Sequence, residues 1–203
     1  MAESVFNPEL AGTAGKTVAA LERISEAFRV LLWEENRRNG LSPVQNQIII
    51  FLLHHSGALC SVSALAAEFN MSKPTMSDAI KVLEQKEFIK REIADDARSF
   101  RILLTAKGRQ LAKKTELFAA PIAAPVAAMP AKQQEQLFDS LLQVIAALQK
   151  GGIIQQQRMC LSCRNYRSEK NGQFYCTLLQ QKLTTADLRI DCPEHELSEI
   201  ITL

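Results

Sequence analysis

The stretch that decides the fold reads Lys90-Arg91-Glu92-Ile93-Ala94-Asp95-Asp96-Ala97-Arg98-Ser99-Phe100-Arg101-Ile102-Leu103-Leu104-Thr105. Two runs of β-prone residues flank a polar turn, which predicts a β-hairpin. A helix-turn-helix pattern precedes the hairpin, and a further helix is expected to begin at Thr105. This order of elements predicts a winged helix-turn-helix, with one helix suited to a major groove of DNA and a basic hairpin suited to a minor groove.

Positive charge is concentrated around this hairpin. The 203 residues carry a formal net charge of only +2. Between residues 72 and 114 the eleven Lys and Arg exceed the six Asp and Glu by five, whereas the rest of the chain nets −3. Such asymmetry favours a polyanionic partner for this segment. A solvated lysine-rich surface is the alternative, and the fold pattern favours the polyanion.

The chain shows no targeting or membrane segment in its sequence pattern. Its first residues lack the basic and apolar regions of a secretory signal peptide. The longest apolar run, residues 48–53, is too short to span a bilayer. We therefore expect a cytoplasmic protein with no membrane partner. In a reducing cytosol its five cysteines are not expected to form disulfides, and the clustered ones are expected to serve metal or redox chemistry.

Hydrophobic spacing predicts helices on both sides of the hairpin. An amphipathic helix is expected over residues 12–38, ended by Asn39-Gly40. Ser42 is the expected N-cap of the next helix, with Pro43 in its first turn. Ser61 is expected to cap a short third helix, and Ser72 a fourth that runs to about Glu87.

Prolines punctuate the helical region that follows the hairpin. Pro121, Pro125 and Pro130 lie in an alanine-rich stretch, so the helix that starts at Thr105 is expected to kink or break between residues 119 and 130. A last amphipathic helix is expected over residues 133–150. Gly151-Gly152 then marks a boundary, because the composition changes beyond it.

The helix after the turn carries short polar and basic side chains in its first half. Ile80, Val82 and Leu83 are expected to form its buried face. The side chains expected to face outward, toward base edges and phosphates, are Ser72, Lys73, Thr75, Met76, Ser77 and Lys81. Arg98 at the hairpin tip suits a narrow minor groove, and Asp96 is placed to orient it through a salt bridge.

Residues 12–150 resemble the MarR family of bacterial winged helix-turn-helix regulators. The resemblance is carried by Leu41-Ser42-Pro43-Val44-Gln45, by residues 61–66, by residues 72–89, and above all by Asp96-Ala97-Arg98-Ser99-Phe100-Arg101 followed by Leu104-Thr105-Ala106-Lys107-Gly108. It implies a homodimer with interleaved first and last helices, a near-palindromic double-stranded DNA operator, and a small-molecule inducer as in many members. It also implies that Arg98 is the wing-tip residue, Asp96 its partner, and Arg101 a backbone or supporting contact.

Four cysteines near the end of the chain follow the spacing Cys160-x2-Cys163-x12-Cys176-x15-Cys192, with Pro193 directly after the last. A pair two residues apart can grip one metal, and two further thiolates complete a tetrahedral set. Zn²⁺ is the expected ion, as a structural site that staples a short module poor in large apolar residues. An iron–sulfur cluster is the alternative, and would make the tail a redox or iron sensor. The remaining alternative is that the four thiols bind nothing and are inert small hydrophobic residues.

Three further residues invite metal or redox interpretations. His195 is able to replace one thiolate, although a solvent-exposed position is the simpler reading. Cys60 is expected to be a buried apolar residue rather than an oxidant sensor. His54 and His55 diverge around a helix axis and are interpreted as a helix end rather than as a metal site.

These patterns predict a mainly α protein with a small β wing. The expected division is a dimerisation helix in residues 1–40, a DNA-binding winged helix-turn-helix in 41–108, dimerisation helices in 109–150, and a cysteine-rich metal-binding tail in 151–203. The predicted function is a homodimeric transcription regulator, a repressor in the first instance. A zinc-dependent enzyme lacks an HExxH motif, a phosphate loop and a nucleophile–base pair, so no enzyme is expected. A protein-interaction adaptor with a zinc-stapled tail is the other alternative.

Overall fold

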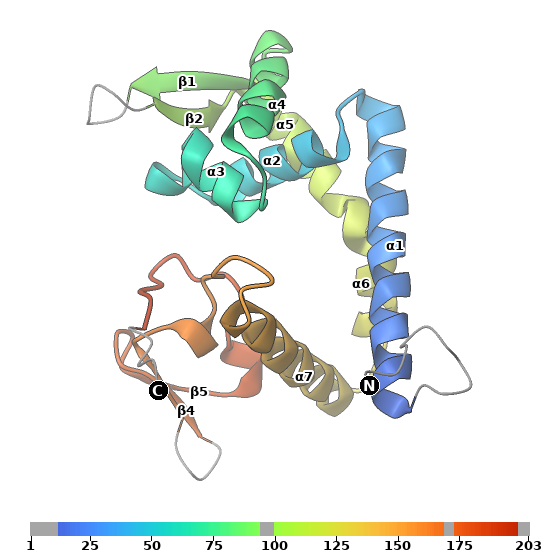
Figure 1. The fold of residues 1–203 in the computed structure, drawn as a ribbon, viewed down its shortest axis with the longest axis vertical. Helices are drawn as coiled ribbons and strands as arrows, with labels where there is room; N and C mark the ends of the chain where they lie inside the picture. Colours follow the sequence, from blue (N-terminus) through green and yellow to red (C-terminus); the bar gives the residue numbers. More distant parts are fainter. Residues whose placement is uncertain (1–11, 94–99, 169–172, 199–203) are drawn as a thin grey trace. The chain divides into compact units, whose positions relative to one another are not determined.

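The computed structural model describes residues 12–93, 100–168 and 173–198. The chain divides into two compact units, one of residues 1–66 and 72–125 and the other of residues 67–71 and 126–203 (Figure 1). The fold is mainly helical, with a β-hairpin in the first unit and a small β-sheet in the second. The predicted class, mainly α with a β wing, is therefore confirmed, and the second sheet is an addition to it.

The first unit contains the predicted winged helix-turn-helix (Figure 1). Its elements are α1 (Thr13–Asn39), α2 (Pro43–His54), η1 (Gly57–Cys60), α3 (Val62–Glu68), α4 (Lys73–Gln85), β1 (Ile89–Ile93), β2 (Phe100–Leu104), α5 (Ala106–Thr115), η2 (Glu116–Ala119) and α6 (Ala120–Ala127). The strands β1 and β2 pair antiparallel, with Ile89 opposite Leu104 and Ile93 opposite Phe100. The predicted hairpin is therefore confirmed, and the structure adds its register.

Local capping chemistry sets where the helices of this unit begin. Ser42 and Gln45 form a reciprocal capping box at α2, with each side chain bonded to the other's backbone N–H. The Ser72 hydroxyl accepts from the Thr75 N–H at 3.2 Å, and the Thr105 hydroxyl accepts from the Gly108 N–H at 3.0 Å. These three predicted helix starts are confirmed.

The first helical break follows from Gly40, and the second from the prolines. Gly40 ends α1 with φ of 68°, a left-handed conformation that glycine adopts without strain. Further along, α5 ends at Thr115, passes through η2, and continues as α6 to Ala127. Pro130 then caps α7, so the predicted break between residues 119 and 130 is confirmed at residues 128–130.

The core of the first unit lies between α2, α3, α4 and the hairpin. Its fully buried large side chains are Leu41, Ile48, Ile49, Leu65, Met76, Ile80, Leu83 and Ile102. One buried polar group is part of it: Asn46 accepts a hydrogen bond from the Asn39 amide at 2.8 Å and donates to the Leu41 carbonyl at 3.2 Å. Because both bonds are made, its burial adds no unsatisfied group to the core.

The second unit combines the last long helix with the cysteine-rich tail. It contains α7 (Ala131–Lys150), η3 (Cys160–Ser162), β3 (Tyr166–Ser168), β4 (Phe174–Cys176), β5 (Gln181–Leu183) and η4 (Thr185–Asp187). The three strands form one antiparallel sheet in the order β3-β4-β5. The helix α7 thus packs in the same compact unit as the tail, and the glycines after it mark a helix end rather than the edge of that unit.

A shared hydrophobic core holds the second unit together. Leu142 of α7 is buried with Met159, Leu183 and Leu188 of the tail. Half-buried side chains pack around them, and they are Phe138, Ile145, Ala146, Cys160, Leu161, Tyr166, Phe174 and Cys176. The apolar residues of the tail alone are too few for a core, and side chains of α7 supply the others.

Candidate DNA-binding surface and cysteine pocket

The exposed face of α4 carries most of the residues predicted to meet DNA. Ser72, Lys73, Thr75, Ser77 and Lys81 are all exposed. The Ser72 and Thr75 hydroxyls lie 2.7 Å apart, so the N-terminal end of the helix presents two linked hydroxyls with a lysine beside them. Hydroxyl and ammonium donors at a helix N-terminus are the groups that bind phosphates and base edges.

Met76 does not belong to this face. Its side chain is fully buried, together with Ala79, Ile80 and Leu83. These positions follow the spacing of a helix face that packs on the core. The prediction that Met76 faces outward is therefore wrong, and its proposed contact with DNA loses its basis. Val82, predicted as core, is only half-buried.

The wing is described up to its tip. Asp96 and Arg98 lie outside the described residues, so their predicted roles stay predictions. Arg101 is half-buried on β2, opposite Glu92 of β1. Arg91 of β1 donates to the Glu84 carboxylate of α4 at 3.1 Å. This pair joins the base of the hairpin to the helix whose outer face carries the predicted DNA contacts.

Close backbone contact fixes the hairpin against α5. The Phe88 carbonyl, just before β1, accepts from the Thr105 N–H at 3.0 Å. A Cβ at Gly108 would lie 1.8 Å from that carbonyl oxygen, so only glycine fits here. Lys107 reaches back to the Lys86 carbonyl at 2.9 Å. The start of α5 therefore acts as the anchor on which the wing is built.

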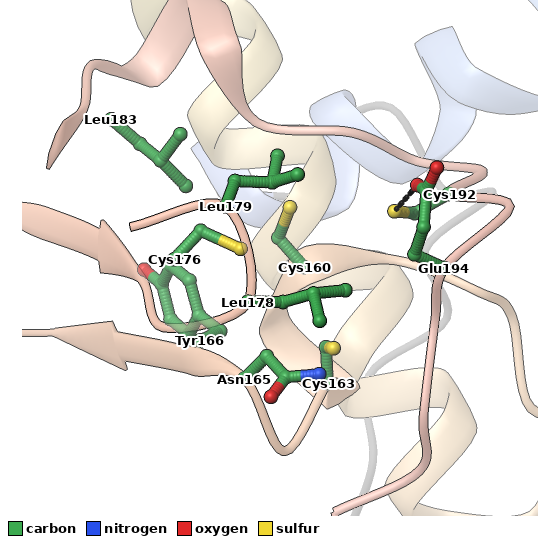
Figure 2. A pocket seen from close by; sticks show the side chains of 10 residues that line it. All are labelled: Cys160, Cys163, Asn165, Tyr166, Cys176, Leu178, Leu179, Leu183, Cys192 and Glu194. Atoms are coloured by element: carbon green, nitrogen blue, oxygen red, sulfur yellow. Dashed lines mark hydrogen bonds between the residues drawn. The ribbon is translucent and has the colours of Figure 1, made fainter. Parts of the chain in front are cut away.

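All four tail cysteines line one pocket (Figure 2). The pocket holds about 360 Å³ of empty space, part of it open to solvent, and its other lining residues are Asn165, Tyr166, Leu178, Leu179, Leu183 and Glu194. The structure thus brings together the four residues that their spacing predicted as one site. Among the described residues, however, no three His, Cys, Asp or Glu side chains stand close enough to one another to form a metal-binding group.

Backbone hydrogen bonds set the positions of these cysteines. Cys163 donates its N–H to the Cys160 carbonyl at 2.9 Å, which closes the η3 turn. Cys176 lies in β4, paired with Tyr166 on one side and Gln181 on the other. Cys192 donates its N–H to the Arg158 carbonyl at 2.8 Å. The pocket is therefore assembled by the main chain of the tail itself.

Two of the sulfur atoms have polar neighbours. The Arg189 backbone N–H donates to Cys160 Sγ at 3.3 Å, and its guanidinium lies 3.7 Å from Cys192 Sγ. The Cys192 thiol in turn donates to the Glu194 carboxylate at 3.4 Å, as Figure 2 shows. Burial raises the pKa of Cys192, so its neutral thiol is favoured in this arrangement. Sequence reasoning missed Arg189 and Glu194, because neither belongs to a metal-ligand motif.

The structure also shows how far His195 and Cys60, the two other candidates for metal or redox chemistry, are buried. His195 is half-buried, with Nε2 3.0 Å from the Ser162 hydroxyl, and burial lowers its pKa. It is thus not the solvent-exposed residue that the sequence suggested. Cys60 is 1% exposed in the first unit, and burial raises its pKa. This agrees with the expectation of a buried apolar residue.

The first unit defines a class of protein, the winged helix-turn-helix proteins. The sequence model of the MarR family matches residues 39–99, which span α2, α3, α4 and the first strand of the hairpin. A search of curated protein sequences finds no significant match.

Solved structures share this fold. The MepR–DNA complex of Staphylococcus aureus is similar with a TM-score of 0.55 and 22% identity, over 64% of this chain and 96% of that one. A MarR transcriptional regulator from Methanosarcina mazei Go1 gives 0.55 and 21%, over 68% and 96%. The transcriptional regulator PA3341 gives 0.56 and 25%, over 66% and 98%. These matches cover nearly the whole length of the known proteins and leave about a third of this chain outside them.

No helix within the described ranges is long and apolar enough to cross a membrane.

Proposed function

We propose that this protein is a homodimeric, sequence-specific DNA-binding transcription regulator of the MarR type that acts as a repressor. The observation that carries the proposal is the exposed N-terminal face of α4, with Ser72, Lys73, Thr75 and Ser77, next to a hairpin anchored on α5. The similarity to MepR, which has been crystallised with DNA, supports it. The basic surplus of residues 72–114 supplies the phosphate-binding charge.

Unpartnered apolar side chains support the dimer. Along α1 they include Val18, Ile24, Val30 and Trp33, each exposed by 45% or more. Along α7, Leu137, Val144 and Leu148 form an exposed stripe, on a different face from the residues that pack on the tail. Exposed apolar stripes of this kind mark surfaces that another chain covers.

The test of DNA binding is a gel shift with the intact protein and promoter DNA at several salt concentrations. A regulator gives a specific complex that weakens with salt, whereas an adaptor that does not use its winged helix gives none. The Arg98→Ala variant is expected to weaken operator binding and to leave the dimer intact. Lys150→Ala, which removes an exposed base from the end of α7, is the matched control. Unchanged operator affinity in Arg98→Ala would contradict the wing assignment.

The four-cysteine pocket is proposed as a Zn²⁺ site, with an iron–sulfur cluster as the second candidate. Four soft thiolates suit either group. The pocket also contains a buried amide nitrogen, Asn165 Nδ2, for which no partner is found within the described residues. Such an orphaned donor fits a pocket that receives a negatively charged metal–thiolate group. The apolar lining by leucines and Tyr166 limits the access of solvent to the thiols, which suits either group.

The role proposed for the bound group is sensory rather than purely structural. The tail has a core with α7, and backbone hydrogen bonds position the cysteines, so the unit does not depend on a metal staple alone. Two ligands, Cys160 and Cys176, also pack against the Leu142 core, so rearrangement of these thiolates around a metal reaches α7 directly. Because α7 also bears the exposed stripe proposed for the dimer, a rearrangement at the cysteines is transmitted through this helix to the dimer surface.

Metal and sulfide analysis of anaerobically purified protein tests the site. One zinc per chain without colour identifies a zinc protein, and iron with sulfide and a brown colour identifies a cluster. Cys163→Ser is expected to lose the metal, whereas Cys60→Ser, the control in the first unit, is expected to retain it. Full metal occupancy in Cys163→Ser would show that the four-cysteine assignment is wrong.

A further inference from the structure

Asn165 lies two residues after the Cys160–Cys163 turn and lines the same pocket. One end of its side chain is occupied: Oδ1 accepts from the Thr177 hydroxyl at 3.2 Å. Its backbone carbonyl also accepts from the Thr177 N–H at 2.8 Å. The other end, Nδ2, is buried and makes no hydrogen bond in the described parts of the chain. Thr177 therefore holds the residue in place while its amide N–H groups are left unused.

An unused buried donor is unusual in a folded protein. Buried polar groups nearly always find a partner, since burial without one costs free energy. Asn165 Nδ2 is the buried side-chain atom of this kind among the residues that the structure describes. Figure 2 shows this amide nitrogen on the side of Cys163. The position of the donor thus coincides with the site where negatively charged sulfur is proposed to form.

The pocket needs donors when it is filled. Four thiolates around a divalent ion leave a net charge of −2, and thiolate ligands are stabilised by N–H donors from outside the ligand set. Arg189 already supplies its backbone N–H to Cys160 and its guanidinium to Cys192. Neither of these Arg189 contacts is to the sulfur of Cys163. Asn165 lines the pocket on the side of Cys163.

We propose that Asn165 is a positioning residue for the bound metal, donating an N–H···S hydrogen bond from Nδ2 to the Cys163 thiolate when the site is occupied. This inference rests on the proposed four-cysteine site. It assigns opposite consequences to Asn165 in the two states of the protein. In the metal-free state the amide N–H is a buried group without a partner, and in the filled state it stabilises the metal–thiolate group.

The test uses the full-length variant Asn165→Leu, whose side chain branches at Cγ as that of asparagine does but has no donor. Zn²⁺ affinity is measured by competition with a chromophoric chelator, and stability by urea unfolding of the zinc-free protein. We expect zinc affinity about 10- to 100-fold weaker, as for the loss of other groups that support metal ligands. The urea midpoint of the zinc-free variant is expected to be unchanged or higher, because the deleted donor had no partner. The Thr177 hydroxyl, which loses Oδ1 as an acceptor, retains the backbone carbonyl of residue 165 at 3.2 Å.

A second variant keeps the inference falsifiable if leucine packs poorly. Asn165→Asp retains an acceptor for Thr177 and replaces the donor with negative charge, so zinc affinity is expected to fall further. Unchanged zinc affinity in both variants would overturn the role of Asn165. A lower midpoint of zinc-free Asn165→Leu with unchanged zinc affinity would show a merely structural residue. If the wild-type protein binds no zinc in the same assay, the four-cysteine site itself fails, which is a separate result.

Discussion

Gly108→Ala is expected to destabilise the winged helix although alanine favours a helix. Gly108 lies in the first turn of α5 and packs against the backbone of Phe88. An added Cβ would lie 1.8 Å from the Phe88 carbonyl oxygen, 2.8 Å from its carbon and 3.2 Å from its Cα. All three atoms belong to the main chain, so no side-chain rotation relieves the contact.

Two opposing effects decide the outcome. Replacing glycine by alanine inside a helix contributes about 1 kcal/mol of stability. The contact with the carbonyl oxygen is 1.6 Å shorter than the 3.4 Å at which ordinary contacts begin, so α5 and Phe88 must move apart. Overpacking of this kind costs about 1–3 kcal/mol, and the displaced carbonyl also accepts the Thr105 N–H, worth about 1 kcal/mol. We expect a net loss of about 2 kcal/mol.

The assay is urea unfolding of the full-length variant followed by a gel shift with operator DNA. DNA affinity is expected to fall as well, because the carbonyl that would move lies just before β1 of the wing. Gly151→Ala is the matched control: its nearest contact would be 3.4 Å, from the Ala147 carbonyl, and a change of less than about 0.5 kcal/mol is expected. A Gly108→Ala protein as stable as the wild type would refute the reasoning.

Two further predictions concern buried residues of the first unit. Met76→Ala is expected to lower the free energy of unfolding by about 2–5 kcal/mol in a urea titration, because Met76 is fully buried, whereas Met76→Leu conserves volume and should cost less than about 1.5 kcal/mol. If Met76→Leu alters sequence preference in a binding-site selection, Met76 contacts DNA after all. Cys60 is expected to resist iodoacetamide at neutral pH, because it is buried and burial raises its pKa, while the half-buried tail cysteines of the metal-free protein react first. Mass spectrometry of digested protein over time measures this, and equal rates at all five cysteines would contradict it.

Local chemistry explains why the helix starts were predictable. An N-cap side chain bonds a backbone N–H only three residues later in the chain. The helix starts at Ser42, Ser72 and Thr105 could therefore be predicted without information from the rest of the fold. The hairpin follows in the same way from two β-prone runs, whereas its register comes from the structure. The prediction of core residues was less accurate in α4. Met76, Ile80 and Leu83 have the spacing of one buried helix face, but Met76 has polar neighbours on both sides, and the pattern therefore assigns it to the exposed face.

Long-range packing explains what the sequence did not disclose. The tail looked short of apolar residues because Phe138 and Leu142, which complete its core, lie on a helix that seemed to belong elsewhere. The cysteine spacing predicted one site, and the structure gathers all four cysteines around one pocket. Asn165 carries no motif, however, and its interest lies only in an unpaired buried nitrogen. Such a feature exists in three dimensions and leaves no pattern along the chain.

The two apolar sides of α7 restrict how this helix can change during evolution. One side contributes Leu142 to the tail core, and another side exposes Leu137 and Val144. A polar substitution at Leu142 destabilises the core against which Cys160 and Cys176 pack. A polar substitution at Leu137 or Val144 weakens the surface proposed for a partner chain. Neutral drift is therefore expected on the remaining polar face of α7, which includes Gln136, Ser140, Gln143 and Lys150.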